Sequence, residues 1–405
     1  MTDPTQPDLR YSPLHAIHEA AGASFTDFAG WLMPVRYTSD LAEHHAVRTA
    51  GGIFDISHMA EFVIEGPDAA AYLDRALAGR LSAIAVGQAK YTLLLSEAGG
   101  IVDDLIVYRQ GQQRFLVIAN AGNRDAVAAA FAERARRAPV AASFAAEPPA
   151  GAGTEAFLFI EGVSGVATVA DITEEVALIA VQGPVARAVL EAAPLEGTDP
   201  SLEDLGYYAW SSSRFQGEHV FIGRTGYTGE DGFELLVPNR AAGALWDALR
   251  AAGEPLGLVP AGLAARDTLR LEAGMPLYGH ELSLDVLPAQ AGLGRVVPLK
   301  TKQADFVGRA ALEAGAAADA AVLVGLVAEG RRAGRAGYAV FDRPDAGTPV
   351  GEITSGALSP TLGHPIAMAF VPPALAEPGT ALFIDVRGTR IPATVTTLPF
   401  YRRNS

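Results

Sequence analysis

The strongest constraint on the fold is a short segment, residues 91–109, in which two apolar runs flank a pair of glycines. Glycine adopts backbone angles that other residues resist, so Gly99 and Gly100 predict a tight turn between the two strands of a hairpin. Asp103 and Asp104 follow this turn directly and precede a further apolar run. Two adjacent carboxylates in a run that otherwise favours burial are costly, so their position needs an explanation.

Two interpretations of this aspartate pair are open. Neighbouring residues of a strand point to opposite faces, so at most one of the two carboxylates can face a given pocket. In the first interpretation both acids are solvated at the turn and cap the strand. In the second, one aspartate faces a cleft, where it positions or polarises a substrate nitrogen.

Length and composition exclude several classes of protein. A chain of 405 residues predicts two or three domains with a large core. It contains no cysteine, which excludes disulfides, thiolate nucleophiles and cysteine-ligated metals. The net charge of −15 argues against bulk binding to nucleic acid. No apolar run approaches the roughly 20 residues of a bilayer span, and the polar N-terminus lacks the features of a targeting signal, so we expect a cytoplasmic protein without membrane contact.

Periodicity and turn residues predict an alternation of helices and strands. Ser39 is a suitable N-cap for the second helix, and Gly51-Gly52 is expected to end it. The segment 138–156, rich in Ala, Pro and Gly, is expected to be a loop. From about residue 320 short β runs punctuated by Gly and Pro predict a separate small barrel or sandwich. The expected helices are 13–21, 39–49, 67–80, 123–137, 185–192 and 261–273, and the expected strands include 53–59, 114–120, 176–184, 219–222 and 233–237.

A second acidic position follows the glycine-rich turn 225–232. Glu234 lies between Phe233 and Leu235 in a predicted strand. A strand carboxylate beside such a turn can accept two parallel N–H bonds from a flat heterocycle, for example the guanidine-like edge of a pterin. The alternative is that Glu234 lies on the solvated face of an alternating strand.

Two arginines mark the helix predicted at 261–273. Arg266 and Arg270 are four residues apart and therefore share a helix face, where leucines surround them. A semi-buried arginine needs an anion or another acceptor, which a ligand could supply. The alternative is a purely structural ion pair with Asp267 or Glu272.

No motif indicates a metal, a dinucleotide or a nucleoside triphosphate. His44 and His45 are neighbours on a predicted helix and cannot share a face, and no HExxH-type spacing is present, so we expect no metal site. The chain also lacks the G-x-G-x-x-G and G-K-[ST] loops and the G-x-S-x-G elbow.

Beyond these patterns, blocks in a fixed order along the whole chain resemble the aminomethyltransferase of the glycine cleavage system, the T-protein family. The most specific block is AGLAARDTLRLEAGMPLYGHEL at 261–282. The other blocks are FAGW at 28–31, MPV at 33–35, FDISHM at 54–59, GGIVDDL at 99–105, GYTGEDG at 226–232, DFVG at 305–308, ITSGALSPTL at 353–362, IAM at 366–368 and PF at 399–400.

This resemblance implies a fold and an activity. The family fold is an α+β cloverleaf of three domains, in which two mixed α/β domains surround a central folate cavity and a β-barrel domain follows. We therefore expect a folate-binding region of two interleaved domains at 1–319 and a barrel at 320–405. The family activity takes the aminomethyl group from the dihydrolipoyl arm of its partner, the H-protein, and transfers the carbon to tetrahydrofolate. The products are 5,10-methylene-tetrahydrofolate and ammonia, and no metal is involved.

The resemblance also implies roles for particular residues. The critical aspartate of the family falls on Asp104, which would hold the folate near N10 and support its attack on the methylene carbon. Glu234 would bind the pterin edge, and Arg266 would be a further folate contact. Weaker matches that would contact the same folate are Tyr91, Asn120, Met59 and, at the end of the chain, Arg402.

Three competing readings come from outside this activity. The sarcosine and dimethylglycine dehydrogenases have a similar C-terminal half, but they carry a flavin-binding domain before it, which we do not expect here. The folate-binding iron–sulfur assembly protein is a binding module without transferase activity, and it is marked by a cysteine-containing K-G-C-Y-x-G-Q-E motif. This chain has no cysteine and carries the T-protein block around Arg266 instead. A purely structural scaffold would leave Asp104, Glu234 and Arg266 without a shared ligand.

Overall fold

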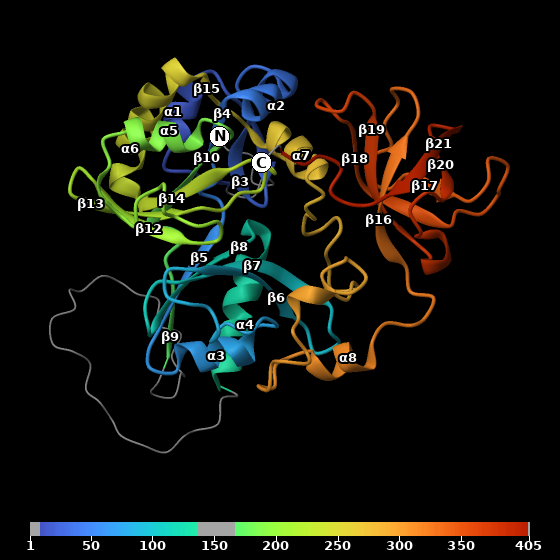
Figure 1. The fold of residues 1–405 in the computed structure, drawn as a ribbon, viewed down its shortest axis with the longest axis horizontal. Coiled ribbons are helices and arrows are strands. Elements are labelled where there is room, and N and C mark those ends of the chain that lie inside the picture. The colour runs from blue at the N-terminus through green and yellow to red at the C-terminus, as the bar shows by residue number, and fades with distance from the viewer. Residues whose placement is uncertain (1–8, 137–166, 404–405) are drawn as a thin grey trace, which may run out of the picture.

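The computed structural model describes residues 9–136 and 167–403, which form three lobes (Figure 1). The predicted loop at 138–156 lies outside the described residues. Two lobes contain mixed layers of helix and sheet, and the third is a closed β-barrel. The predicted α+β fold with a C-terminal barrel is therefore confirmed, while the division between residues 319 and 320 stays a prediction.

The first lobe is a seven-stranded sheet in the order β11-β12-β13-β14-β10-β4-β15, with a small sheet β1-β3-β2 beside it. The inner strand β10 is a continuous apolar run because both of its faces are covered. Ile179 and its alternate neighbours pack under helices α5 and α6, whereas Leu178 faces the second lobe. The strands are β1 (Arg10–Tyr11), β2 (Ser24–Phe28), β3 (Trp31–Arg36), β4 (Gly51–Asp55), β10 (Val176–Gln182), β11 (Glu196–Asp199), β12 (Trp210–Phe215), β13 (Glu218–Gly223), β14 (Gly232–Pro238) and β15 (Leu258–Pro260), and the helices are α1 (His15–Ala20), α2 (Asp40–Thr49), α5 (Ala186–Ala192), α6 (Asn239–Gly253) and α7 (Leu263–Glu272).

The second lobe is a five-stranded sheet in the order β6-β7-β8-β5-β9. Its outer face packs against α3 and α4, and its inner face packs against the first sheet through a shared apolar core that includes Phe54, Tyr108 and Phe221. The expected hairpin at 91–109 is present, since β6 and β7 pair antiparallel around the glycine turn. The elements are β5 (Ala60–Glu65), α3 (Ala69–Ala76), β6 (Ala89–Leu95), β7 (Ile101–Arg109), β8 (Arg114–Ala119), η1 (Ala121–Asn123), α4 (Arg124–Arg136) and β9 (Thr168–Asp171), with α8 (Arg309–Ala314) nearby.

The chain passes between these two sheets twice. It leaves the first sheet after β4, enters the second at β5, and returns from β9 to β10. The outgoing connection is only four residues long, 56–59, and it is pinned by backbone hydrogen bonds such as Ile56 N to Leu178 O at 3.0 Å. The second lobe is thus an insertion in the sequence of the first.

Two local boundaries differ from the predictions. Helix α2 ends at Thr49, just before Gly51-Gly52, as expected, but strand β4 begins at these glycines and not at residue 53, because Gly52 pairs with Gln182 and with Val259 on either side. A side chain at Gly52 would also meet Val47 at 2.5 Å. The helix expected at 67–80 is shorter, α3 ending at Ala76, because the buried Lys302 amine donates to the carbonyls of residues 77–79 and holds them in a loop.

The third lobe is a closed barrel and not a sandwich. Six strands close in the order β16-β19-β18-β17-β20-β21, and β16 pairs with β21 to complete the ring. Closure removes the exposed edges that an open sheet of short strands would present. The strands are β16 (Val322–Ala328), β17 (Ala339–Phe341), β18 (Gly351–Leu358), β19 (Pro365–Val371), β20 (Ala381–Val386) and β21 (Thr389–Thr396).

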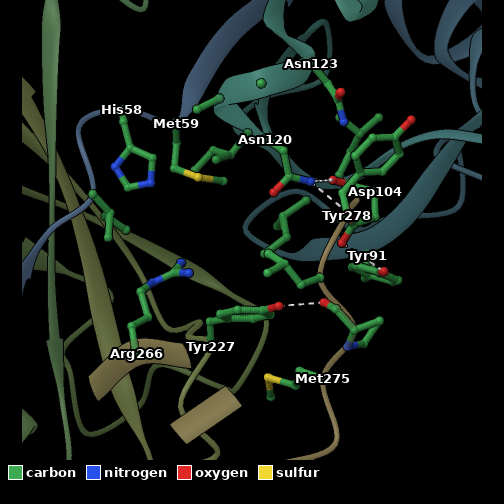
Figure 2. Close-up of a pocket in the computed structure, with 18 of the residues that line it drawn as sticks. His58, Met59, Tyr91, Asp104, Asn120, Asn123, Tyr227, Arg266, Met275 and Tyr278 are labelled. Carbon is green, nitrogen blue, oxygen red and sulfur yellow. Dashed lines mark hydrogen bonds between the residues drawn. The ribbon is translucent and has the colours of Figure 1, made fainter. Parts of the chain in front are cut away.

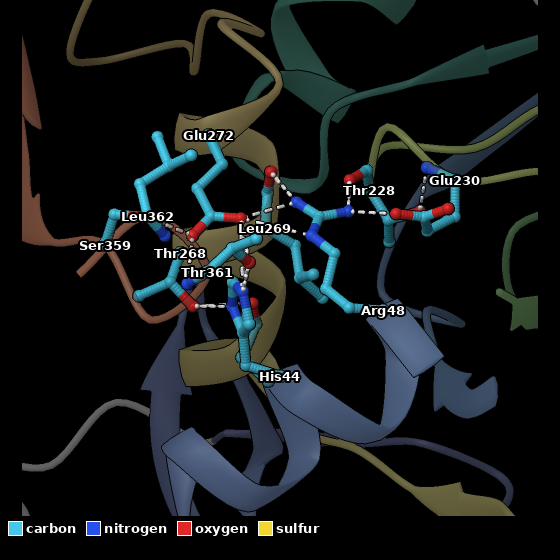
Figure 3. A network of polar contacts seen from close by, with 11 residues as sticks. His44, Arg48, Thr228, Glu230, Thr268, Leu269, Glu272, Ser359, Thr361 and Leu362 are labelled. Atoms are coloured by element: carbon cyan, nitrogen blue, oxygen red, sulfur yellow. Dashed lines mark hydrogen bonds and ion pairs between the residues drawn. The ribbon is translucent and has the colours of Figure 1, made fainter. Parts of the chain in front are cut away.

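A buried polar network joins the barrel to the first lobe (Figure 3). Glu272, at the end of α7, binds Arg48 of α2 at 2.8 Å and accepts hydrogen bonds from Ser359 and Thr361, which follow barrel strand β18. His44 bonds Thr361 at 2.9 Å and Thr268 at 2.8 Å. Ser39 caps α2, as predicted, by accepting from Ala42 N. Within the described ranges no helix is long and apolar enough to cross a membrane.

Candidate active site

A cavity of about 380 Å³ lies between the two sheets and is closed on one side by the segment 274–278 (Figure 2). Its wall is contributed by pieces that are far apart in sequence. They include the connection 56–59, strands β6 and β7, the turn 120–123, the glycine-rich turn before β14, and helix α7. A volume of this size fits a small organic ligand.

The aspartate pair divides between the cavity and the protein interior. Asp104 lines the cavity and is half-buried, whereas Asp103 is fully buried behind it. Tyr91 donates its hydroxyl to Asp104 at 3.0 Å, and the side-chain amide of Asn120 donates to Asp104 at 2.8 Å. The interpretation in which both acids are solvated is therefore wrong, and the strand alternation places only one of them in the pocket.

Burial raises the pKa of both aspartates. For Asp103 the nearby charge of Asp104 raises the pKa further, while hydrogen bonds from Asn123 and Asn120 lower it in part. For Asp104 burial is again the largest influence on the pKa, opposed by the hydrogen bonds from Tyr91 and Asn120. A carboxylate kept among few donors in an apolar cavity is poised to accept a proton or to stabilise a developing cation.

Glu234 of β14 also lines the cavity and is 7 % exposed, so it does not lie on a solvated face. Its Oε2 accepts from Thr225 at 2.6 Å, and Thr225 in turn contacts the hydroxyl of Tyr108 at 2.5 Å. Burial raises the pKa of Glu234, and the hydrogen bond from Thr225 opposes this shift. The second oxygen, Oε1, has no hydrogen-bond partner among the described residues and can therefore accept from a ligand.

The two arginines of α7 have different surroundings. Arg270 forms the expected structural pair with Asp267, at 2.7 Å, and a further one with Glu281, at 3.2 Å, whereas Glu272 pairs with Arg48. Arg266 lines the cavity instead, with its guanidinium 4.6 Å from the centre of the Tyr227 ring. In the described part of the chain no carboxylate lies within ion-pair distance of Arg266. A ligand acceptor thus remains the reading that accounts for its charge.

The structure brings most of the predicted site residues to one cavity. Tyr91, Asn120 and Met59 all line it, together with the three residues discussed above. Arg402 does not belong to the described wall, and its side chain is exposed. The geometry gives no support to a folate contact at Arg402, which stays a prediction. The roles of the other residues also stay predictions.

Sequence reasoning missed several residues of the wall. The most prominent is Tyr227, which packs on Arg266 and donates its hydroxyl to Pro276 O at 2.5 Å. His58 is buried beside Phe28, and burial together with the charge of Arg266 lowers the pKa of His58 to about 3, so the imidazole is neutral near pH 7. Both lie inside blocks that carried the family resemblance, which was the available signal.

No group of three or more His, Cys, Asp or Glu side chains that could hold a metal occurs within residues 9–136 and 167–403. His44, which was considered as a metal ligand, forms hydrogen bonds to two threonines and lies 3.2 Å from Glu272. The polar groups of the cavity are two carboxylates, one guanidinium, one imidazole, amides and hydroxyls, which suit an organic ligand with several N–H groups.

Comparison with known proteins agrees with this arrangement. Residues 14–301 match the model of the GCVT N-terminal domain, and residues 322–402 match the glycine cleavage T-protein C-terminal barrel domain. The aminomethyltransferase of Cutibacterium acnes is 54% identical over 98% of this chain and 99% of its own length, and that of Saccharopolyspora erythraea is 52% identical over the same shares. The crystal structure of the glycine cleavage system aminomethyltransferase T from Bartonella henselae superposes with a TM-score of 0.82 at 37% identity, covering 97% of this chain and 98% of that one. The chain therefore belongs to the glycine cleavage T-protein family.

Proposed function

We propose that this chain is the aminomethyltransferase of a glycine cleavage system. It takes the aminomethyl group carried on the dihydrolipoyl arm of an H-protein and transfers the methylene carbon to tetrahydrofolate. In the overall reaction the carbon loses its bonds to sulfur and to the amino nitrogen and gains bonds to N5 and N10 of the folate. The two hydrogens that leave N5 and N10 complete the free thiol and the ammonia.

One observation carries this proposal. Asp104, Glu234 and Arg266 line separate walls of one cavity, and each can form a further hydrogen bond to a ligand. The pterin edge of tetrahydrofolate presents parallel N–H groups, which suit the free oxygen of Glu234. Arg266 supplies a donor to a pterin or carboxyl oxygen. These contacts leave the bridging amine of the folate for Asp104.

Asp104 would act mainly by position and charge. Its carboxylate, held by Tyr91 and Asn120, faces the amine that attacks the methylene carbon and stabilises the positive charge that develops on nitrogen. Because both substrates are held in one cavity, proximity supplies a large part of the rate. No metal is assigned to this reaction. The H-protein is the proposed macromolecular partner, and the cytoplasmic setting expected from the sequence stays a prediction.

The test is formation of 5,10-methylene-tetrahydrofolate from aminomethylated H-protein and tetrahydrofolate, with Asp104→Ala and the isosteric Asp104→Asn beside the wild type. Loss of a positioned acid–base group costs about 10²–10⁴ in rate, so turnover should fall at least a hundredfold. Tetrahydrofolate affinity should change much less. The exposed Asp125 of α4 provides a matched control, Asp125→Ala.

Two results would count against the proposal. Equal losses of turnover and affinity in the Asp104 variants would remove the specific role of this residue. A wild type that binds folate and never releases product would instead favour a binding module without transferase activity.

A further inference from the structure

The buried neighbour of Asp104 has an unusual set of partners. Asp103 is 0% exposed, does not line the cavity, and accepts three hydrogen bonds. The backbone N–H of Asn120 donates to Oδ2 at 3.0 Å, and the side-chain amides of Asn120 and Asn123 donate to Oδ1 at 2.8 Å and 2.7 Å. Asp103 therefore holds the cavity turn 120–123 from behind.

The side chain of Asn120 is shared between the two aspartates. Its Nδ2 lies 2.8 Å from Asp103 Oδ1 and 2.8 Å from Asp104 Oδ1. At a pH above the raised pKa values of both aspartates the carboxylates only accept hydrogen bonds, so both require the NH₂ group of the amide and neither can pair with its oxygen. Because an amide offers two hydrogens, the pair of acids uses both of them.

This arrangement fixes where the amide oxygen points. In Figure 2 the nitrogen of Asn120 points toward Asp104 and the oxygen points the opposite way, into the cavity. Among the described residues this oxygen has no hydrogen-bond donor. With Asp103 in place, turning the amide over would set its oxygen against two carboxylates, so the orientation shown is strongly favoured.

We propose that Asp103 is a positioning residue that locks the Asn120 amide so that its carbonyl oxygen accepts a hydrogen bond from an N–H group of the bound reduced folate. This inference rests on the proposed function and adds to it a second acceptor beside Asp104. A reduced pterin carries secondary amine N–H groups, whereas an oxidised pterin ring lacks them at the corresponding ring nitrogens. The paired acids therefore favour the reduced form of the ligand through an amide that both acids hold in one orientation.

The experiment is a double-mutant cycle in tetrahydrofolate affinity, measured by anaerobic calorimetry on the full chain for wild type, Asp103→Asn, Asn120→Ala and the double variant. Asparagine at 103 offers a donor as well as an acceptor, so Asp104 is the one carboxylate left to hold the Asn120 amide and the orientation of the amide is less strongly fixed. Loss of one neutral hydrogen bond weakens binding by about 3- to 10-fold, and we expect this change for Asp103→Asn. In the Asn120→Ala background the same substitution should have almost no further effect.

A matched control tests whether any buried aspartate would behave in the same way. Asp74 is 8% exposed, does not line the cavity, and accepts two backbone N–H bonds from Leu81 and Ser82. Asp74→Asn should leave affinity unchanged. An effect of Asp103→Asn that persists in full without the Asn120 side chain, or an equal effect of Asp74→Asn, would overturn the inference.

A second measurement does not depend on whether the Asp103 variant folds. In the wild type the two side-chain amide hydrogens of Asn120, assigned by their loss in Asn120→Ala, should be protected from solvent exchange in ¹⁵N–¹H spectra. Rapid exchange of either hydrogen would contradict the shared arrangement. A wild type that does not bind tetrahydrofolate at all would overturn the proposed function, and this inference with it.

Discussion

The substitution Glu234→Gln separates a binding role from a structural one. Glu234 offers one oxygen to Thr225 and leaves the other for the ligand. Glutamine keeps a single acceptor, and if Thr225 retains it, an NH₂ group faces the N–H groups of the pterin. The change removes one charge-assisted hydrogen bond, worth about 1.5–3 kcal/mol, so the Kd for tetrahydrofolate should rise roughly 10- to 150-fold.

The same substitution should not destabilise the free protein. Burial raises the pKa of Glu234 in the folded state, so ionisation opposes folding. This penalty grows as the pH rises from the ordinary glutamate pKa, is complete above the raised pKa, and is absent below the ordinary one. Neutral glutamine carries no such penalty. At pH 8 the variant should therefore unfold in urea at a midpoint equal to or above that of the wild type.

The assay pairs anaerobic calorimetry with urea unfolding. Glu61→Gln is the matched control, because Glu61 is also a buried strand glutamate, 1% exposed, but it lies outside the cavity wall. Tetrahydrofolate affinity should be unchanged in this control. Wild-type affinity in Glu234→Gln, or a loss of affinity that simply follows a loss of stability, would refute the reasoning.

Three further predictions concern the rest of the molecule. Arg48→Met leaves the buried Glu272 without its arginine partner and should lower the free energy of unfolding by about 3–5 kcal/mol. Arg36→Met removes an exposed ion pair and should change that free energy by less than about 1 kcal/mol. Urea unfolding measures both changes. Burial raises the pKa of Glu61 well above its ordinary value, so at pH 8 Glu61→Gln should be more stable than the wild type by on the order of 1 kcal/mol or more, and the difference should vanish as the pH falls toward the ordinary glutamate pKa. A difference that does not depend on pH would contradict this cause. Arg402→Ala tests the predicted folate contact at the end of the chain. If Arg402 contacts the folate, its loss should raise the Kd for tetrahydrofolate about tenfold or more in calorimetry, and a change of less than about twofold would contradict the contact.

Features encoded locally were predictable from the sequence. The hairpin at 91–109 follows from a glycine turn between apolar runs, and strand alternation already required Asp103 and Asp104 to differ in their surroundings. The Ser39 cap likewise depends on neighbours within three residues. Such features need no knowledge of the rest of the fold.

Features that depend on distant partners were not predictable in this way. The early end of α3 is caused by Lys302, which is more than 220 residues further along the chain. The strand was expected to start at residue 53 and not at Gly51, because the strands that pair with Gly51 and Gly52, β10 and β15, lie far away in sequence. The choice between a structural and a ligand-facing role for Arg266 depended on where Asp267 and Glu272 find their own partners, which only the assembled fold decides.

The double passage of the chain between the two sheets limits how this protein can be divided. A cut in the connection 56–59, or between β9 and β10, separates strands of one sheet from each other instead of separating the lobes. The first α/β lobe is encoded by two separate stretches, because the strands of the second sheet, β5 to β9, lie between β4 and β10. One continuous gene fragment therefore cannot specify the first lobe alone. The barrel is one continuous stretch and can be exchanged as a unit. Recombination among related genes should therefore replace the barrel far more readily than the first lobe.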